Sequence, residues 1–114
     1  MVNIDSKTED DITTLEINGE VDASSSIQLD ESLGTVVNSG VGKILVNCTQ
    51  LNYISSAGLG VFMSYIDDVN SKEIKMVIFG LNEKVKNVFD ILGLDQLLSI
   101  VNTNAEALKY INEG

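Results

Sequence analysis

The stretch that decides the fold is Asn52-Tyr53-Ile54-Ser55-Ser56-Ala57-Gly58-Leu59-Gly60-Val61-Phe62, in which two serines precede an apolar segment. From Leu59 onward, apolar residues recur at steps of three and four, at Phe62, Met63, Ile66 and Val69. This spacing predicts a helix from about 57 to 70 with one buried face. It also predicts a loop before the helix, with both serines at the point where the helix begins.

The two serines at this junction have two interpretations. A serine hydroxyl can accept a hydrogen bond from a free N–H group of the first helical turn and so act as an N-cap. The same N–H groups, together with the positive end of the helix dipole, favour a phosphate carried on the hydroxyl. Ser55 and Ser56 are therefore candidates both for capping and for phosphorylation.

Length and composition indicate one small domain. The chain has 114 residues, of which 44% are apolar, so we expect a single domain over 1–114 with one core of ordinary size. It contains no apolar run of about 18 residues, and its first eleven residues are polar and acidic, so we expect neither a membrane span nor a secretory signal. These features predict a cytoplasmic protein. Cys48, the single cysteine, follows an apolar run and is expected to be a buried thiol without a role.

The charge is strongly negative and unevenly distributed. Seventeen acidic residues against seven lysines and no arginine give a net charge of −10. This charge disfavours binding to nucleic acid and to an acidic membrane surface. Residues 1–31 hold nine carboxylates and one lysine, a net charge of −8. This region is either a solvated face or a surface that attracts a basic protein partner.

Several kinds of catalytic site are excluded by missing residue types. The chain has no histidine, so Ser-His-Asp triads, Cys-His dyads and zinc sites of His and Cys cannot form within it. The pair Gly58 and Gly60 lacks the third glycine of a dinucleotide-binding motif, and no Gly-Lys-Ser/Thr is present for a P-loop. Ile54 stands where a nucleophile elbow around Ser56 requires glycine. We therefore expect no catalytic residues, no cofactor and no metal.

The other elements are predicted from periodicity and from turn residues. Strands are expected at 2–4, 12–17, 43–48, 75–79 and 97–101. The first two of these are expected to pair across a polar turn at 5–11. A helix is expected at 23–38, after a turn at Gly19. A second is expected from the cap Asn82 to Gly93, and its inward residues are Val85, Val88, Phe89 and Leu92. A last helix is expected after a cap at Thr103 or Asn104, and its inward residues are Ala107, Leu108 and Ile111. The order β-β-α-β-α-β-α-β-α predicts an α/β domain with a mixed sheet of four to five strands and about four helices. Functional loops in such sheets follow the carboxyl ends of strands, here after the strands that contain Ile17 and Ile44.

Three segments together resemble a known family. They are Gly19-Glu20-Val21-Asp22 before the first helix, the run from Leu45 to Ile54, and Ser55-Ser56-Ala57-Gly58-Leu59-Gly60. Over nearly its whole length the chain is similar to STAS-domain proteins of the bacterial anti-sigma factor antagonist type. The common motif of that family is Asp-Ser-(Ser or Thr)-Gly-Leu, and its first serine is phosphorylated by an anti-sigma factor that is also a kinase. Aligning Gly58 and Leu59 with this motif places the acceptor at Ser56, with Ser55 in place of the aspartate.

The resemblance implies a phosphorylation-controlled partner switch. The unmodified chain would bind an anti-sigma factor that is a serine kinase of the ATP-binding type, the form phosphorylated on Ser56 would release it, and a serine phosphatase would reverse the modification. Ser55 is the second candidate acceptor, and its alternative role is the helix cap. Asp22, alternatively an N-cap of the first helix, is expected to lie near Ser56. The partner-binding residues implied by the resemblance are Glu20, Asp22, Ser55, Ser56, Ala57, Gly58 and Leu59.

A different class of function stays open beside the switch. The domain would then be a STAS scaffold without switching, or an accessory subunit of a signalling or membrane transport complex. Such a subunit would hold its partner without being phosphorylated. In neither case do we expect nucleic-acid binding or direct membrane insertion.

Overall fold

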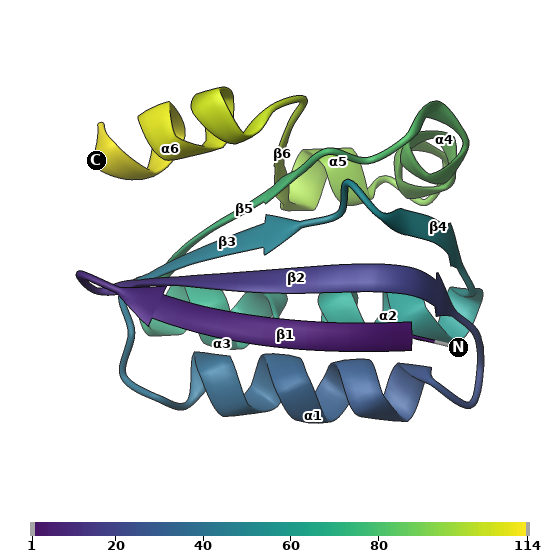
Figure 1. Cartoon of the computed structure of the whole chain (residues 1–114), viewed down its shortest axis with the longest axis horizontal. Coiled ribbons are helices and arrows are strands. Elements are labelled where there is room, and N and C mark those ends of the chain that lie inside the picture. The colour runs from purple at the N-terminus through teal and green to yellow at the C-terminus, as the bar shows by residue number, and fades with distance from the viewer. Residues whose placement is uncertain (1, 114) are drawn as a thin grey trace.

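The computed structural model describes residues 2–113. Strands and helices alternate along most of the chain (Figure 1). The elements are β1 (Val2–Glu9), β2 (Ile12–Val21), α1 (Ser26–Val37), β3 (Lys43–Asn47), β4 (Leu51–Ile54), α2 (Ser56–Ser64), α3 (Ile66–Ser71), β5 (Lys75–Phe79), α4 (Glu83–Ile91), α5 (Leu94–Leu97), β6 (Ser99–Val101) and α6 (Asn104–Asn112).

The strands form one mixed sheet, so the predicted α/β class is confirmed. The strand order is β1-β2-β3-β5-β6, and β4 pairs with the end of β2. The pair β1 and β2 is antiparallel, and every other pair is parallel. The structure has one strand and two helices more than predicted, because β4 and α5 were missed and one predicted helix is divided into α2 and α3.

The first hairpin is longer than predicted. β1 continues to Glu9, and the turn consists only of Asp10 and Asp11, with φ of 50° and 66°. The expected polar turn at 5–11 is therefore wrong. Polar residues extend through this strand because it lies at the edge of the sheet, where charged side chains face solvent.

Gly19 does not form the predicted turn either. It continues β2 with φ of 103°, and the register between β2 and β4 shifts between Gly19 and Glu20, as in a β-bulge. At this point β2 changes partner, from β3 over residues 12–16 to β4 over residues 19–21. The segment predicted as a loop at Asn52 to Ile54 is consequently part of a strand. The first helix begins three residues later than predicted, at Ser26.

The predicted helix at 57–70 is interrupted at Tyr65, between α2 and α3. The Tyr65 hydroxyl donates to the side chain of Asp30 on α1 at 2.8 Å, and the pKa of Tyr65 rises to about 12 because of burial and this contact. Its anchoring holds α2 against α1. Met63, which was predicted to be buried, is 47% exposed, so that assignment is wrong.

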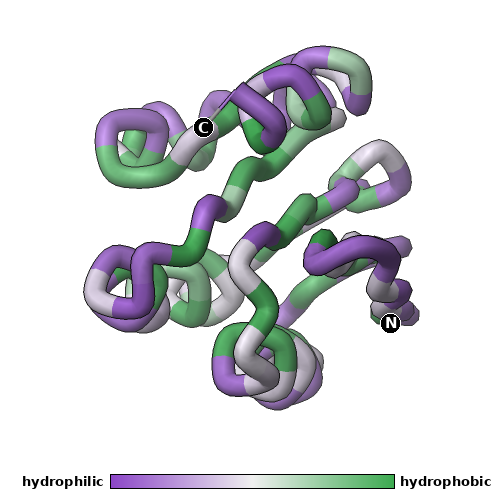
Figure 2. The backbone as a smooth tube through the Cα atoms, turned by 90° about the vertical axis from the view of Figure 1, so that its left-hand side faces the viewer, coloured by the Kyte–Doolittle hydropathy of each residue, from purple (hydrophilic) through white to green (hydrophobic). Residues whose placement is uncertain are grey.

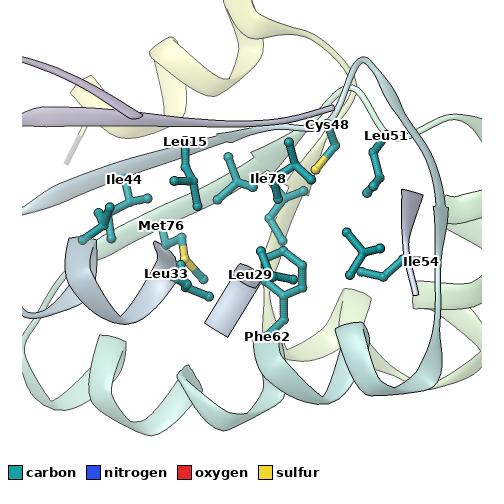
Figure 3. Packing of buried hydrophobic residues seen from close by; sticks show 14 of the residues in the cluster. Leu15, Leu29, Leu33, Ile44, Cys48, Leu51, Ile54, Phe62, Met76 and Ile78 are labelled. Atoms are coloured by element: carbon teal, nitrogen blue, oxygen red, sulfur yellow. The ribbon is translucent and has the colours of Figure 1, made fainter. Parts of the chain in front are cut away.

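Most of the core lies between one face of the sheet and the helices α1 and α2. Figure 3 shows Leu15, Ile44 and Ile78 of the sheet facing Leu29, Leu33 and Phe62 of the helices. The rings of Phe62 and Phe89 pack at 5.9 Å between centroids, which connects α2 to α4. On the opposite face, α6 covers a smaller cluster through Ala107 and Ile111. Figure 2 shows the C-terminal end of the chain at the top, away from the helices at the bottom of the view.

The thiol of Cys48 is buried as predicted, and this burial raises its pKa to about 12.

Two predicted helix caps are confirmed, whereas two residues that were predicted to face inward are exposed. The Asn82 side chain accepts from the Val85 N–H at 2.8 Å, and the Thr103 hydroxyl accepts from the Glu106 N–H at 3.1 Å. Gly93 ends α4 with φ of 74°. Leu92 and Leu108, however, are exposed, because each lies at the margin of its apolar stripe. No helix within residues 2–113 is long and apolar enough to cross a membrane.

Candidate functional site

Two helix starts meet at one end of the sheet. β2 and β4 run parallel with Val21 opposite Ile54, and the Ser55 N–H donates to the Val21 carbonyl at 2.8 Å. The turn after β2 and the turn after β4 therefore leave the sheet side by side, at the right in Figure 1. This brings the segment of Asp22 next to the two serines, as predicted.

The Asp22 turn is closed by reciprocal hydrogen bonds. One carboxylate oxygen of Asp22 accepts from the Ser25 N–H at 2.8 Å and from the hydroxyls of Ser24 and Ser25, each at 2.9 Å. The Ser25 hydroxyl in turn accepts from the Asp22 N–H at 2.8 Å, an arrangement like a capping box. The bond from the Ser25 N–H, with those from the two hydroxyls, lowers the pKa of Asp22 from 3.8 to about 2. Asp22 is therefore not the N-cap of α1, which is Ser25 without a side-chain capping bond; its carboxylate closes the preceding turn and stays charged and exposed.

The second helix start separates the roles of the two serines. Ser55 has an extended backbone at φ −83° and ψ 170°, and its hydroxyl accepts from the Gly58 N–H at 3.2 Å. The capping role of Ser55 is therefore confirmed. Ser56 is the first helical residue and is exposed, and its hydroxyl has no hydrogen-bond partner within residues 2–113.

Gly58 allows this helix start to lie close to the paired strands. A Cβ atom at Gly58 would lie 2.7 Å from Cγ1 of Ile54 and 2.8 Å from Cγ1 of Val21. Leu59 is only 1% exposed and anchors the helix in the core. Two members of the implied partner surface, Gly58 and Leu59, thus lie beneath that surface and support it.

The remaining members of the implied surface reach solvent. Glu20, Asp22, Ser56 and Ala57 are exposed, and Ser55 is half-buried. Glu20 and Asp22 place two carboxylates beside the helix start, and neither forms an ion pair with another residue in 2–113. The same range contains no group of three or more potential metal ligands. The exposed chemistry of the site therefore consists of fixed negative charge next to one free hydroxyl.

Tyr53 was not predicted to be a partner-binding residue, although it lies directly beside Glu20 in the paired strands. The burial pattern of β4 is buried, exposed, exposed, buried. Such a pattern lacks the alternation that indicates a strand, so the sequence offers no signal for the position of this side chain.

Comparisons with known proteins agree with this geometry. The model of the STAS domain family matches residues 3–107. An anti-sigma-B factor antagonist of Staphylococcus epidermidis is 30% identical over 99 residues, which cover 87% of this chain and 92% of the relative. Among solved structures, an anti-sigma factor antagonist from Mycobacterium paratuberculosis has a TM-score of 0.90 at 15% identity, covering 98% and 95% of the two chains. A proposed anti-sigma factor antagonist from Thermotoga maritima has a TM-score of 0.88 at 24% identity, covering 96% and 94%. These two structures show a shared fold.

Proposed function

Because the chain belongs to the STAS domain family, we propose that it is an anti-sigma factor antagonist whose partner binding is controlled by phosphorylation of Ser56. The observation that carries this proposal is the difference in hydrogen bonding between the two serine hydroxyls. Ser55 is occupied as the helix cap, whereas the Ser56 hydroxyl is exposed and free to react. The Asp22 turn beside it offers a second, fixed contact for the same partner.

The partner is an anti-sigma factor that acts as a serine kinase with ATP. In the modification step, the Ser56 oxygen takes the γ-phosphoryl group of ATP, the bond to the β-phosphate oxygen breaks, and ADP and the hydroxyl proton leave. This chain supplies only the acceptor, and the kinase supplies the catalytic groups. A serine phosphatase returns Ser56 to the hydroxyl by hydrolysis.

The physical effect of the phosphate is local. A phosphoserine adds a charge of about −1.5 to −2. The N–H groups and dipole at the start of α2 stabilise that charge within the domain, so the fold is retained. In a contact formed around a neutral serine, the same charge is removed from solvent without a pairing group, which costs binding free energy. Partner affinity therefore falls while folding stability does not.

The contact surface in this proposal has two layers. Glu20, Asp22, Ser56 and Ala57, with Ser55 at their margin, form the layer that meets the anti-sigma factor. Gly58 and Leu59 form the buried layer that fixes the position of the helix start.

The test is incubation with a candidate anti-sigma kinase and ATP, followed by mass mapping of the modified residue in wild type, Ser55→Ala and Ser56→Ala. We expect one phosphate on Ser56 in wild type and in Ser55→Ala, and none in Ser56→Ala. Labelling of Ser56→Ala, or loss of labelling in Ser55→Ala alone, would show that the acceptor is misassigned.

Calorimetry on the same proteins tests the switch itself. Ser56→Ala should bind the kinase like wild type and stay bound in the presence of ATP, and Ser56→Asp should bind more weakly. If no variant is labelled and all bind a partner equally, the chain is a scaffold without a switch.

A further inference from the structure

A groove opens between β4 and α4, next to the surface described above. It has a volume of about 380 Å³, and we call it the β4–α4 groove. The residues of its lining that matter here are Glu20, Tyr53, Ile54, Lys84, Val85 and Val88.

The groove is continuous with the helix start that carries Ser56. Glu20 and Tyr53 are direct neighbours in the parallel pairing of β2 and β4. β4 ends at Ile54, and the chain passes through Ser55 directly into α2. A protein that covers Ser56 and Asp22 can therefore reach the groove across a single strand, as the adjacent positions of β4, α4 and the start of α2 in Figure 1 show.

The lining combines an apolar floor with charged margins. Ile54 and Val85 are buried, Val88 is half-buried, and Tyr53 is 49% exposed. One turn beyond Val88 on the same helix, Ile91 is 81% exposed and extends the apolar surface. An exposed aromatic ring beside branched apolar side chains is typical of the centre of a protein contact.

The two charged residues at the margins, Glu20 and Lys84, are exposed and unpaired. Neither forms an ion pair within residues 2–113. Glu20 belongs to the N-terminal region 1–31, which has a net charge of −8. The side of the groove formed by β2 and β4 therefore favours a basic side chain of a partner.

We propose that the β4–α4 groove is a further contact for the same anti-sigma factor, separate from the surface around Ser56 and Asp22, and that it does not depend on the phosphorylation state of Ser56. An apolar side chain of the partner packs on Tyr53 and Val88, and a neighbouring basic side chain pairs with Glu20. This inference rests on the proposed function. Tyr53 and Val88, which form the apolar contact, lie on β4 and α4, whereas the phosphate acts at the start of α2, so the apolar contact contributes to affinity separately from the phosphate.

The test measures affinity for the anti-sigma factor that binds the wild-type chain, by calorimetry in four proteins: wild type, Tyr53→Ala, Ser56→Asp and the double variant. We expect Tyr53→Ala to weaken binding by at least about tenfold, and by the same factor in the Ser56→Asp background. The matched control is Tyr110→Ala, which removes a tyrosine of similar exposure, 40%, from α6 on the other face of the sheet. It should bind within about twofold of wild type, since surface changes away from a contact have little effect. Thermal melting of each variant confirms that it is folded.

A pair of charge reversals tests the basic partner group. Glu20→Lys and Glu9→Lys change the net charge equally, but Glu9 is at the far end of the first hairpin. Only Glu20→Lys should weaken binding, and it should also reduce the dependence of affinity on salt.

The two proposals fail in different ways. If Ser56→Asp weakens binding but Tyr53→Ala does not, the groove contact is wrong and the switch stands. A Tyr53→Ala effect that vanishes in the Ser56→Asp background would overturn the independence of the two contacts. Absence of both binding and labelling in wild type would overturn the proposed function and the groove contact with it.

Discussion

The turn after β2 and the turn after β4 are neighbouring helix starts that satisfy their polar groups differently. At the first, the Asp22 carboxylate and the Ser25 hydroxyl each accept from the other residue's N–H, so the fixed charge is held in place. At the second, Ser55 alone provides the cap, and the hydroxyl of Ser56 is left free. One turn thus offers a permanent charge and the other a neutral group that can be modified. A surface built in this way can change its charge at one position without changing its shape.

The two glycines of α2 differ in the space around them. At Gly58 a Cβ atom would lie 2.7 Å from Ile54, whereas at Gly60 it would meet nothing within 4 Å. Gly58 is therefore needed for packing of the helix start, and Gly60 is not required by the domain itself.

The largest effect on stability is expected for Gly58→Ala. The added methyl group overlaps buried branched side chains, which should destabilise the fold by about 1 to 3 kcal/mol. Gly60→Ala is the matched control, since it should stabilise the helix by about 0.5 to 1 kcal/mol. Urea unfolding of both variants measures the difference. Equal stability of the two would mean that the second helix start does not depend on close packing.

Replacing Asp22 should affect partner affinity more than folding. Asp22→Ala removes an acceptor for three hydrogen bonds and the fixed charge together, and we expect about a tenfold loss of affinity for the anti-sigma factor. Its melting temperature should fall by less than that of Gly58→Ala. Asp22→Asn keeps an oxygen acceptor without the charge, so it should regain stability but not affinity. A melting shift with unchanged affinity would leave closure of the turn as the whole role of Asp22.

The two serines should differ in their effect on stability. Ser55→Ala removes the cap and should cost about 1 kcal/mol of unfolding free energy. Ser56→Ala removes a hydroxyl without a partner and should change stability by less than about 0.5 kcal/mol. Denaturant unfolding of the two proteins in parallel decides this. A larger loss in Ser56→Ala would reverse the assignment of cap and acceptor.

The smallest expected effect is a titration of the first turn. The folded pKa of Asp22, about 2, is below the ordinary value of 3.8, so the bonds to Ser25 stabilise the turn above pH 3.8 and are lost as the pH falls through about 2. The chemical shift of the Ser25 amide, followed by NMR, should therefore change with a midpoint near pH 2. Asp22→Asn should abolish this change. A midpoint near 3.8 would mean that the carboxylate is not held by the turn.

Much of the architecture could be predicted because it depends on residues close in sequence. The caps at Asn82 and Thr103 and the stop at Gly93 act within one helical turn, so their residue types were sufficient. The buried strands around Ile44 and Ile78 were visible as short apolar runs. The motif from Ser55 to Leu59 placed the candidate site in this segment through its resemblance to a known family.

The errors in the prediction lie where distant segments interact. β4 is a strand because β2 leaves β3 at the Gly19 bulge and pairs with it, and nothing within residues 51–54 indicates this pairing. The predicted helix at 57–70 is interrupted at Tyr65, whose hydroxyl reaches Asp30 on another helix, a contact that the apolar pattern does not indicate.

The sequence by itself therefore determined the α/β class, the main alternation of strands and helices, most of the core and the caps at Ser55, Asn82 and Thr103, since each of these follows from patterns of one or two turns. Only the tertiary structure decided which serine hydroxyl is free, that Gly58 rather than Gly60 is needed for packing, and that Glu20, Tyr53 and Lys84 border one groove. The physical reason is that hydrogen-bond satisfaction and close packing depend on atoms brought together by the sheet. Periodicity along the chain does not indicate those contacts.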